Sequence, residues 1–327
     1  MKHLDAGLMP WLPLKQRNYL LDSLFYDVGS LTPAEIASLS PETDREGSVI
    51  VVPPTAAAQP IRHYRTALRF MNNDGRDIRA IVVAGVGSSV VGTAALARNV
   101  ADAFNCDVAG VVTGYGLTDL LSEALGGWFV FGMSDRMRLE LETRLAALRT
   151  PLPDKISATL GDLGVGIADP FGDRIADTPD VAVLLDILIA HPPKLELLLG
   201  HSKGSLLIDF VLERFLAEAG PDHPLCRKLQ VITVGAVAGL PAAFTRTRQL
   251  LGEYDGLGRI NSRCDVPFET VRGAGHHLNR AIPFHLDLQR TLHGSMQRVP
   301  TEAVERALAA AAPDANGQPW RAARRMS

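Results

Sequence analysis

Short apolar runs alternate with amphipathic stretches through the middle of the chain, and this alternation predicts an α/β protein. Residues 75–85 (GRDIRAIVVAG) form a β-branched run that ends in glycine. Residues 93–105 (TAALARNVADAFN) have apolar positions at helical spacing, and residues 106–114 (CDVAGVVTG) form a second apolar run. A helix between two strand-like runs favours a parallel pair of strands.

The same order returns in the second half of the chain. Thr178 and Pro179 supply a cap residue and a proline at the first helical position, which predicts a helix leading to the apolar strand LELLLG at 195–200. After another helix, the strand-like runs KLQVITVGAV, RQLLG and VPFETV follow, and the last two lead into polar loops. We therefore expect a mostly parallel central sheet with helices on both faces.

The chain before this region has a less regular pattern. Thr32 and Glu35 form a capping box around Pro33, which predicts the start of a helix. Residues 48–53 (SVIVVP) predict a short strand, and residues 61–71 predict a further helix.

The expected organisation is one large α/β domain with additions. The domain spans residues 76–312, with its last helix at 301–311; an N-terminal extension, residues 1–75, packs on it, and residues 313–327 form a C-terminal tail. The regularity breaks at about residues 126–177, which are rich in turns and contain the apolar run GGWFVFGM. Insertions of this length between core elements often have a function, so a lid-like segment is expected here.

Composition and charge exclude several classes of function. The net charge of -3 provides no field for a polyanion, so a nucleic-acid partner is not expected. Three cysteines without C-x-x-C spacing favour neither a disulfide framework nor a zinc site, and they fit a cytoplasmic protein. The histidines lack H-E-x-x-H spacing, so no metal is expected. Residues 80–97 are uncharged but contain central glycines, which favours a buried strand, loop and helix over an integral membrane span.

The pentapeptide Gly200-His201-Ser202-Lys203-Gly204 joins a predicted strand to a predicted helix. In this setting Gly-x-Ser-x-Gly is typical of a nucleophile elbow, a tight turn that exposes the serine above the edge of a sheet. The glycines have a physical reason, because strand and helix approach each other too closely for side chains. Ser202 is therefore a candidate nucleophile.

A serine hydroxyl needs a histidine to take its proton and a carboxylate to orient that histidine. Asp255 and His276 lie downstream in loops that follow apolar runs, and parallel strands deliver such loops to one edge of a sheet. His277 is an alternative base, and Asp265 or Glu253 could take the acid role.

Four segments together resemble the α/β-hydrolase-fold esterases and lipases. In chain order they are AGVGSS (84–89), GHSKGS (200–205), EYDGLG (253–258) and GAGHH (273–277), corresponding to the oxyanion loop, elbow, acid loop and histidine loop. The insertion before the elbow is similar to the lid position of class 3 lipases. Ala84 stands where the family commonly has histidine.

This resemblance implies a role for each motif. Ser202 would attack an acyl carbon, His276 would act as general base and then acid, and Asp255 would orient it. The backbone N–H groups of Val86 and Lys203 would hold the oxyanion. Gly85 and Gly87 would be the glycines of the oxyanion loop, and Gly200 and Gly204 those of the elbow.

The expected function is therefore hydrolysis of a carboxylic ester, either small or lipid-like, without a cofactor. One alternative is a hydrolase-fold protein that has become a binding protein and keeps the elbow. Another is a nucleotide-binding oxidoreductase, suggested by Gly85-x-Gly87 after a strand. The next glycine, Gly92, follows five positions later instead of three, and no acidic residue ends the next strand, which disfavours dinucleotide binding.

Overall fold

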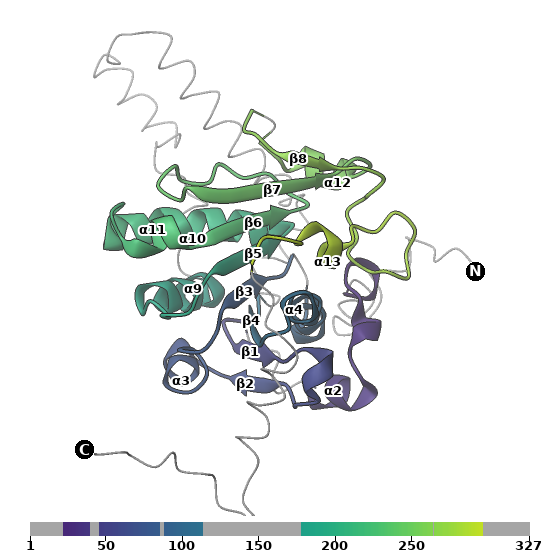
Figure 1. Cartoon of the computed structure of the whole chain (residues 1–327), viewed down its shortest axis with the longest axis horizontal. Coiled ribbons are helices and arrows are strands. Elements are labelled where there is room, and N and C mark those ends of the chain that lie inside the picture. Colours follow the sequence, from purple (N-terminus) through teal and green to yellow (C-terminus); the bar gives the residue numbers. More distant parts are fainter. Residues whose placement is uncertain (1–21, 40–45, 86–87, 114–177, 264, 297–327) are drawn as a thin grey trace, which may run out of the picture.

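The computed structural model describes residues 22–39, 46–85, 88–113, 178–263 and 265–296, which build an eight-stranded sheet with helices on both faces (Figure 1). The strand order is β2-β1-β4-β3-β5-β6-β7-β8. Strands β4 to β8 in this order run parallel, whereas β1 is antiparallel to both β4 and β2. The strands are β1 (Val49–Val52), β2 (Arg62–Tyr64), β3 (Ala80–Val83), β4 (Val108–Val111), β5 (Leu197–His201), β6 (Gln230–Val234), β7 (Arg246–Gly252) and β8 (Glu269–Val271).

The chain reverses its direction of travel across the sheet between β4 and β5. From β3 it crosses to β4 on one side, and it later returns to the other side of β3 as β5 before it continues outward to β8. Strands β3 and β5 are therefore neighbours whose following segments depart in opposite directions. In open α/β sheets such a switch point leaves a crevice beyond the carboxyl ends of the strands, where ligands bind.

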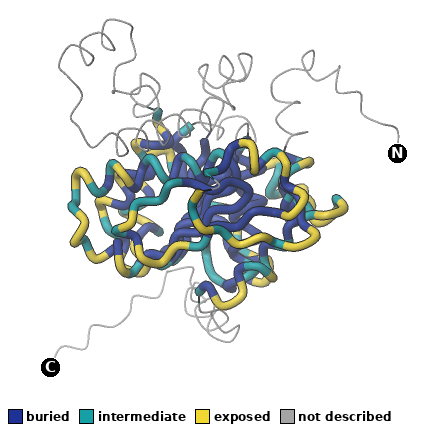
Figure 2. The backbone as a smooth tube through the Cα atoms, turned by 90° about the horizontal axis from the view of Figure 1, so that it is seen from above, coloured by how far each residue is buried: buried dark blue, intermediate teal, exposed yellow. Residues whose placement is uncertain are grey.

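Both faces of the sheet are covered, because successive side chains of a strand point to opposite sides. In β3, Ala80 and Val82 pack in the core with α4, while Ile81 and Val83 pack in the core with α9 and α10. Figure 2 shows this buried layer through the centre of the molecule. The first face carries η2 (Val28–Ser30), α2 (Pro33–Ser38), η3 (Thr55–Ala57), α4 (Val90–Phe104) and α13 (Leu288–Thr291); the second carries α3 (Ala67–Asn72), α9 (Pro179–Ile189), α10 (Lys203–Ala219) and α11 (Pro224–Lys228).

Several local expectations are confirmed. Helix α2 begins with the predicted capping box, in which Thr32 and Glu35 exchange side-chain to backbone hydrogen bonds, and α9 has Pro179 at its first position. Strands β3 and β4 pair in parallel through α4, as the strand–helix–strand pattern predicts. Helix α4 begins at Val90, earlier than the predicted amphipathic run, so Gly92 lies inside this helix.

The prediction of a helix over residues 61–71 is wrong in its first half. Residues 62–64 form β2, and only Ala67–Asn72 is helical. Strand β2 pairs with β1, and Arg62 is held there by Asp74 and Asp107 at 2.6 and 2.5 Å. Pairing with a neighbouring strand outweighs the local helical pattern, because strand formation depends on tertiary contacts that no local window contains.

The expected boundary at residue 75 divides the sheet. Strands β1 and β2 belong to the sheet itself, so this part of residues 1–75 completes one side of the core instead of packing on it from outside. The insertion at 126–177, the helix at 301–311 and the tail at 313–327 lie outside the described residues. Within the described ranges, no helix has the length and apolarity to cross a bilayer.

Candidate active site

Ser202 lies at the turn between β5 and α10, at the switch point of the sheet. Its backbone has φ 57° and ψ -124°, a conformation that costs a non-glycine residue about 1–3 kcal/mol. Two backbone hydrogen bonds hold the turn: Ser202 N–H donates to Val234 at 2.7 Å, and Ser205 N–H donates to the carbonyl of Ser202 at 2.9 Å. The strand–helix junction therefore has the conformation expected of an elbow.

The elbow glycines allow this turn to form. A Cβ atom at Gly200 would lie 2.6 Å from the backbone nitrogen of Ser205, and one at Gly204 would lie 2.3 Å from the carbonyl oxygen of Val83. Both contacts are with backbone atoms that cannot move aside. Helix α10 thus crosses β5 and β3 at a distance that only glycine permits.

His276 reaches Ser202 from the loop after β8. Its Nε2 atom lies 3.0 Å from Ser202 Oγ, within the range needed for proton transfer. The neighbouring His277 stacks on Phe25 with ring centroids 5.4 Å apart, and burial lowers its pKa. Of the two candidate bases, the structure brings His276 to the serine.

Asp255 follows β7 and faces His276. Its Oδ2 atom lies 2.8 Å from His276 Nδ1, and its Oδ1 atom accepts a hydrogen bond from Gly258 N–H at 2.6 Å. This second bond also caps α12 (Gly256–Ile260), so helix formation fixes the direction of the carboxylate. The other two acid candidates are occupied elsewhere, since Asp265 pairs with Arg263 at 3.0 Å and Glu253 accepts from Gly273 N–H at 2.8 Å.

The three side chains form one buried line. Ser202, Asp255 and His276 are 4%, 1% and 7% exposed. The carboxylate can only accept, so His276 carries its proton on Nδ1 and presents Nε2 as an acceptor to the hydroxyl. In this arrangement a histidine can draw the proton from a serine hydroxyl while a carboxylate stabilises the imidazolium that results.

The structure describes one of the two predicted oxyanion donors, Lys203. Lys203 is the first residue of α10, so its backbone N–H belongs to those that make no bond within the helix. Gly85 follows β3 and packs against the nucleophile, because a Cβ atom there would lie 3.0 Å from Ser202 Cβ. Val86 and Gly87 lie outside the described residues.

His201, the residue before the candidate nucleophile, is buried and bonded to two other segments. It is 1% exposed, and its Nδ1 atom lies 3.0 Å from the hydroxyl of Tyr26. Its Nε2 atom lies 3.0 Å from the backbone carbonyl of His276. Burial lowers the pKa of His201 well below its usual value, so the ring is neutral.

Tyr26 and Asp22 also reach this region, and no sequence motif points to either. Tyr26 accepts a hydrogen bond from Gly85 N–H at 2.6 Å. Asp22 lies 2.5 Å from Ser89 Oγ and 3.2 Å from Ser88 Oγ, the last two residues of the segment 84–89. Burial raises the pKa of Asp22 to about 7. A Cβ atom at Gly92 would lie 2.0 Å from Asp22 Oδ1, so this glycine makes room for the carboxyl group.

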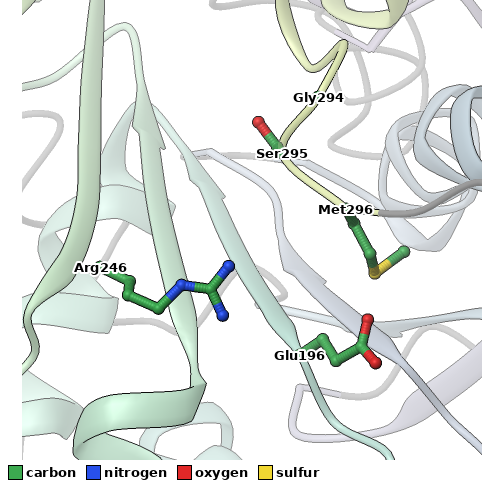
Figure 3. A pocket seen from close by; sticks show the side chains of 5 residues that line it. All are labelled: Glu196, Arg246, Gly294, Ser295 and Met296. Atoms are coloured by element: carbon green, nitrogen blue, oxygen red, sulfur yellow. The ribbon is translucent and has the colours of Figure 1, made fainter.

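A cavity of about 360 Å³ lies away from these residues (Figure 3). It is lined by Glu196, Arg246, Gly294, Ser295 and Met296. Glu196 precedes the first residue of β5 and Arg246 begins β7, so the cavity is at the amino edge of the sheet, opposite Ser202. In the described part of the chain, no group of three or more His, Cys, Asp and Glu side chains is arranged to hold a metal ion.

No model of a known protein family matches the chain, and neither a curated protein nor a solved structure matches it. Any functional conclusion therefore depends on the geometry of Ser202 and its neighbours.

Proposed function

We propose that this protein is a serine hydrolase that cleaves carboxylic esters. The observation that carries the proposal is the buried line from Ser202 through His276 to Asp255, with the serine held in a strained turn at the switch point of the sheet. Strain at one polar residue costs stability, and it is found at functional sites more than elsewhere.

In this proposal the reaction has two halves. His276 Nε2 takes the proton of Ser202 as Oγ forms a bond to the acyl carbon, and the same nitrogen then gives the proton to the departing alkoxide. A water molecule then attacks the acyl carbon as His276 takes its proton. The bond from the acyl carbon to Oγ breaks, His276 returns the proton to Ser202 Oγ, and the carboxylic acid is released. Asp255 keeps the imidazole oriented and stabilises its charged form.

The negative oxygen that forms at each stage needs hydrogen-bond donors. We assign these to the backbone N–H groups of Lys203 and Val86. Removal of one such donor in enzymes of this type typically costs about 2.7–4 kcal/mol in the barrier. The close packing of Gly85 on Ser202 supports a donor on this loop.

We further propose that the fold is that of the α/β-hydrolases. The mostly parallel sheet and the chain order of serine, aspartate and histidine support this assignment. The expected substrate is a small or lipid-like ester, and we propose a cytoplasmic location because the cysteines show no disulfide spacing; in the described residues Cys106 and Cys226 are both free.

The direct test replaces Ser202 by alanine. Hydrolysis of a p-nitrophenyl ester should fall by about four to six orders of magnitude in kcat/KM, with the unfolding midpoint retained. A fluorophosphonate should label the wild-type chain at Ser202. The matched control is Ser295→Ala, which removes another buried serine at the opposite edge of the sheet and should leave both activity and labelling unchanged.

Two outcomes would overturn the proposal. Full activity in the Ser202→Ala variant would exclude a serine nucleophile at this position. A wild-type chain that neither hydrolyses esters nor reacts with the fluorophosphonate would favour the alternative of a binding protein on a hydrolase-like scaffold.

A further inference from the structure

A short segment from the beginning of the described chain contacts all three loops of the candidate site. The segment comprises residues 22–26, of which 22–25 are helical. It lies beside the oxyanion loop, the elbow and the histidine loop. Tyr26 bonds to Gly85 after β3 and to His201 at the end of β5. The carbonyl of Phe25 accepts from Leu278 N–H at 2.7 Å, two residues after His276.

The hydrogen atoms in this network have one consistent arrangement. The backbone N–H of Gly85 can only donate, so the Tyr26 oxygen accepts at 2.6 Å and directs its own hydrogen to His201 Nδ1 at 3.0 Å. His201 must then carry its proton on Nε2, which donates to the carbonyl of His276 at 3.0 Å. A backbone carbonyl can only accept, so both hydrogen bonds of His201 require the same tautomer of its ring.

Each side chain of this hydrogen-bond network is buried and close to the reacting atoms. Tyr26 is 2% exposed and His201 is 1% exposed. Gly85 packs on the Cβ atom of Ser202, and Gly235, with φ +70°, makes room for both imidazoles, since a Cβ atom there would lie 3.0 Å from His276 Cε1. A buried polar chain of this kind is rigid only while every member is bonded.

The histidine loop needs such an anchor. It follows β8, which has only three residues, lies at the edge of the sheet and pairs with β7 alone. Its own strand therefore gives it little support. The loop is instead held from the other side by the carbonyl of His276, by Leu278 and by Asn279, whose Nδ2 donates to Ser23 at 2.5 Å.

We propose that Tyr26 and His201 are positioning residues, which hold the oxyanion loop and the histidine loop in register on either side of Ser202. This inference rests on the proposed hydrolase function. Neither side chain exchanges a proton with substrate. Their effect is on geometry, and a displacement of about 1 Å in a reacting group can lower a rate by about 100-fold.

The test replaces Tyr26 by phenylalanine, which keeps the ring and removes the hydroxyl. We expect kcat for a p-nitrophenyl ester, and the rate of fluorophosphonate labelling, to fall by about 10- to 100-fold, with KM changed by less than about 2-fold. The matched control is Tyr64→Phe, which removes a phenol bonded to Asp74 at 2.7 Å on strand β2, at the far end of the sheet. This variant should keep the wild-type kcat.

A second pair of variants examines His201, at the other end of the hydrogen-bond network. His201→Ala removes both bonds, whereas His201→Gln retains an amide N–H that can reach the carbonyl of His276. We expect His201→Gln to restore part of the kcat that His201→Ala loses. Equal losses in kcat, with equal unfolding midpoints, would contradict a role in holding the histidine loop.

An NMR measurement separates this inference from the proposed function. In the wild type, the imidazole ¹⁵N signals should show His201 protonated on Nε2, and in Tyr26→Phe the signals of His201 and His276 should both shift. If the wild type proves inactive, the NMR result still tests the positioning role. Unchanged kcat and unchanged His276 signals in Tyr26→Phe would overturn it.

Discussion

The two edges of the sheet both carry charged side chains, but these side chains differ in how deeply they are buried. At the carboxyl edge, Asp255 and His276 are buried and bonded into a line with Ser202. At the amino edge, Glu196 pairs with Arg79 at 2.7 Å, and both side chains remain partly in contact with solvent. Buried polar groups cost free energy unless all are bonded, whereas exposed ion pairs contribute about 0–1 kcal/mol.

This difference indicates where the fold restricts the choice of residue most strongly. The carboxyl edge combines strain at Ser202, close packing at Gly200 and Gly204, and buried polar side chains. Each of these reduces stability or demands a specific partner. The amino edge has a cavity and ion pairs whose side chains remain partly exposed, so substitutions at exposed positions there should have small effects.

The largest effect is expected from a substitution that disrupts the hydrogen bonds among Ser202, His276 and Asp255 at the carboxyl edge. Asp255→Asn replaces the acceptor that faces His276 Nδ1 with an amide that can donate there, which favours the wrong imidazole tautomer. We expect kcat to fall by about 10⁴-fold, as measured by ester hydrolysis at saturating substrate. Asp265→Asn is the control, because this exposed aspartate pairs with Arg263; its activity should match the wild type. Comparable losses in both variants would argue against Asp255 as the orienting acid.

A second prediction concerns how the free energy of unfolding depends on pH through Asp22, near the carboxyl edge. The pKa of Asp22 is raised by burial from 3.8 to about 7, so between these values the folded protein keeps a proton that the unfolded chain has lost. The free energy of unfolding should therefore fall as pH rises from about 4 to about 7. At 1.36 kcal/mol per pKa unit, Asp22 should lower the free energy of unfolding by about 4 kcal/mol over this pH range.

Asp22→Asn removes this titration and should flatten the curve. The measurement is urea unfolding of both proteins at several values between pH 4 and pH 7, with the difference in free energy plotted against pH. Parallel curves for wild type and variant would show that the Asp22 carboxyl group is not buried as an acid beside Ser88 and Ser89.

The smallest effect is expected at the amino edge. Arg246 is exposed, and its guanidinium donates to the carbonyl of Lys228 at 2.9 Å beside the cavity. Arg246→Gln should change the free energy of unfolding by less than about 0.5 kcal/mol and leave kcat unchanged. A loss of activity would mean that the two edges are coupled and that the cavity contributes to the site.

Much of the central sheet could be predicted from the sequence, because its strands are buried on both faces and read as continuous apolar runs. The elbow was predicted for a related reason, since Gly200 and Gly204 reflect a close approach of backbones that leaves a local signature. Strand β2 was missed because its partner, β1, decides its conformation.

The choice between His276 and His277 could not be made from the sequence, since adjacent residues in a loop differ only in direction. The same holds for Asp255 against Glu253 and Asp265. Tyr26 and Asp22 had no signal at all, because their partners lie 59 and 66 or more positions away and no spacing rule connects them. Such contacts become visible only when the fold places separate segments together.

The separations in these contacts have a consequence for how the protein is made. Tyr26 meets His201 across 175 positions, and Ser23 meets Asn279 across 256. On a ribosome, Tyr26 must therefore remain without this partner until residue 201 has been synthesised, and Ser23 until residue 279 has been. Long-range closure of this kind slows folding, so the last contacts to form should be those that complete the site.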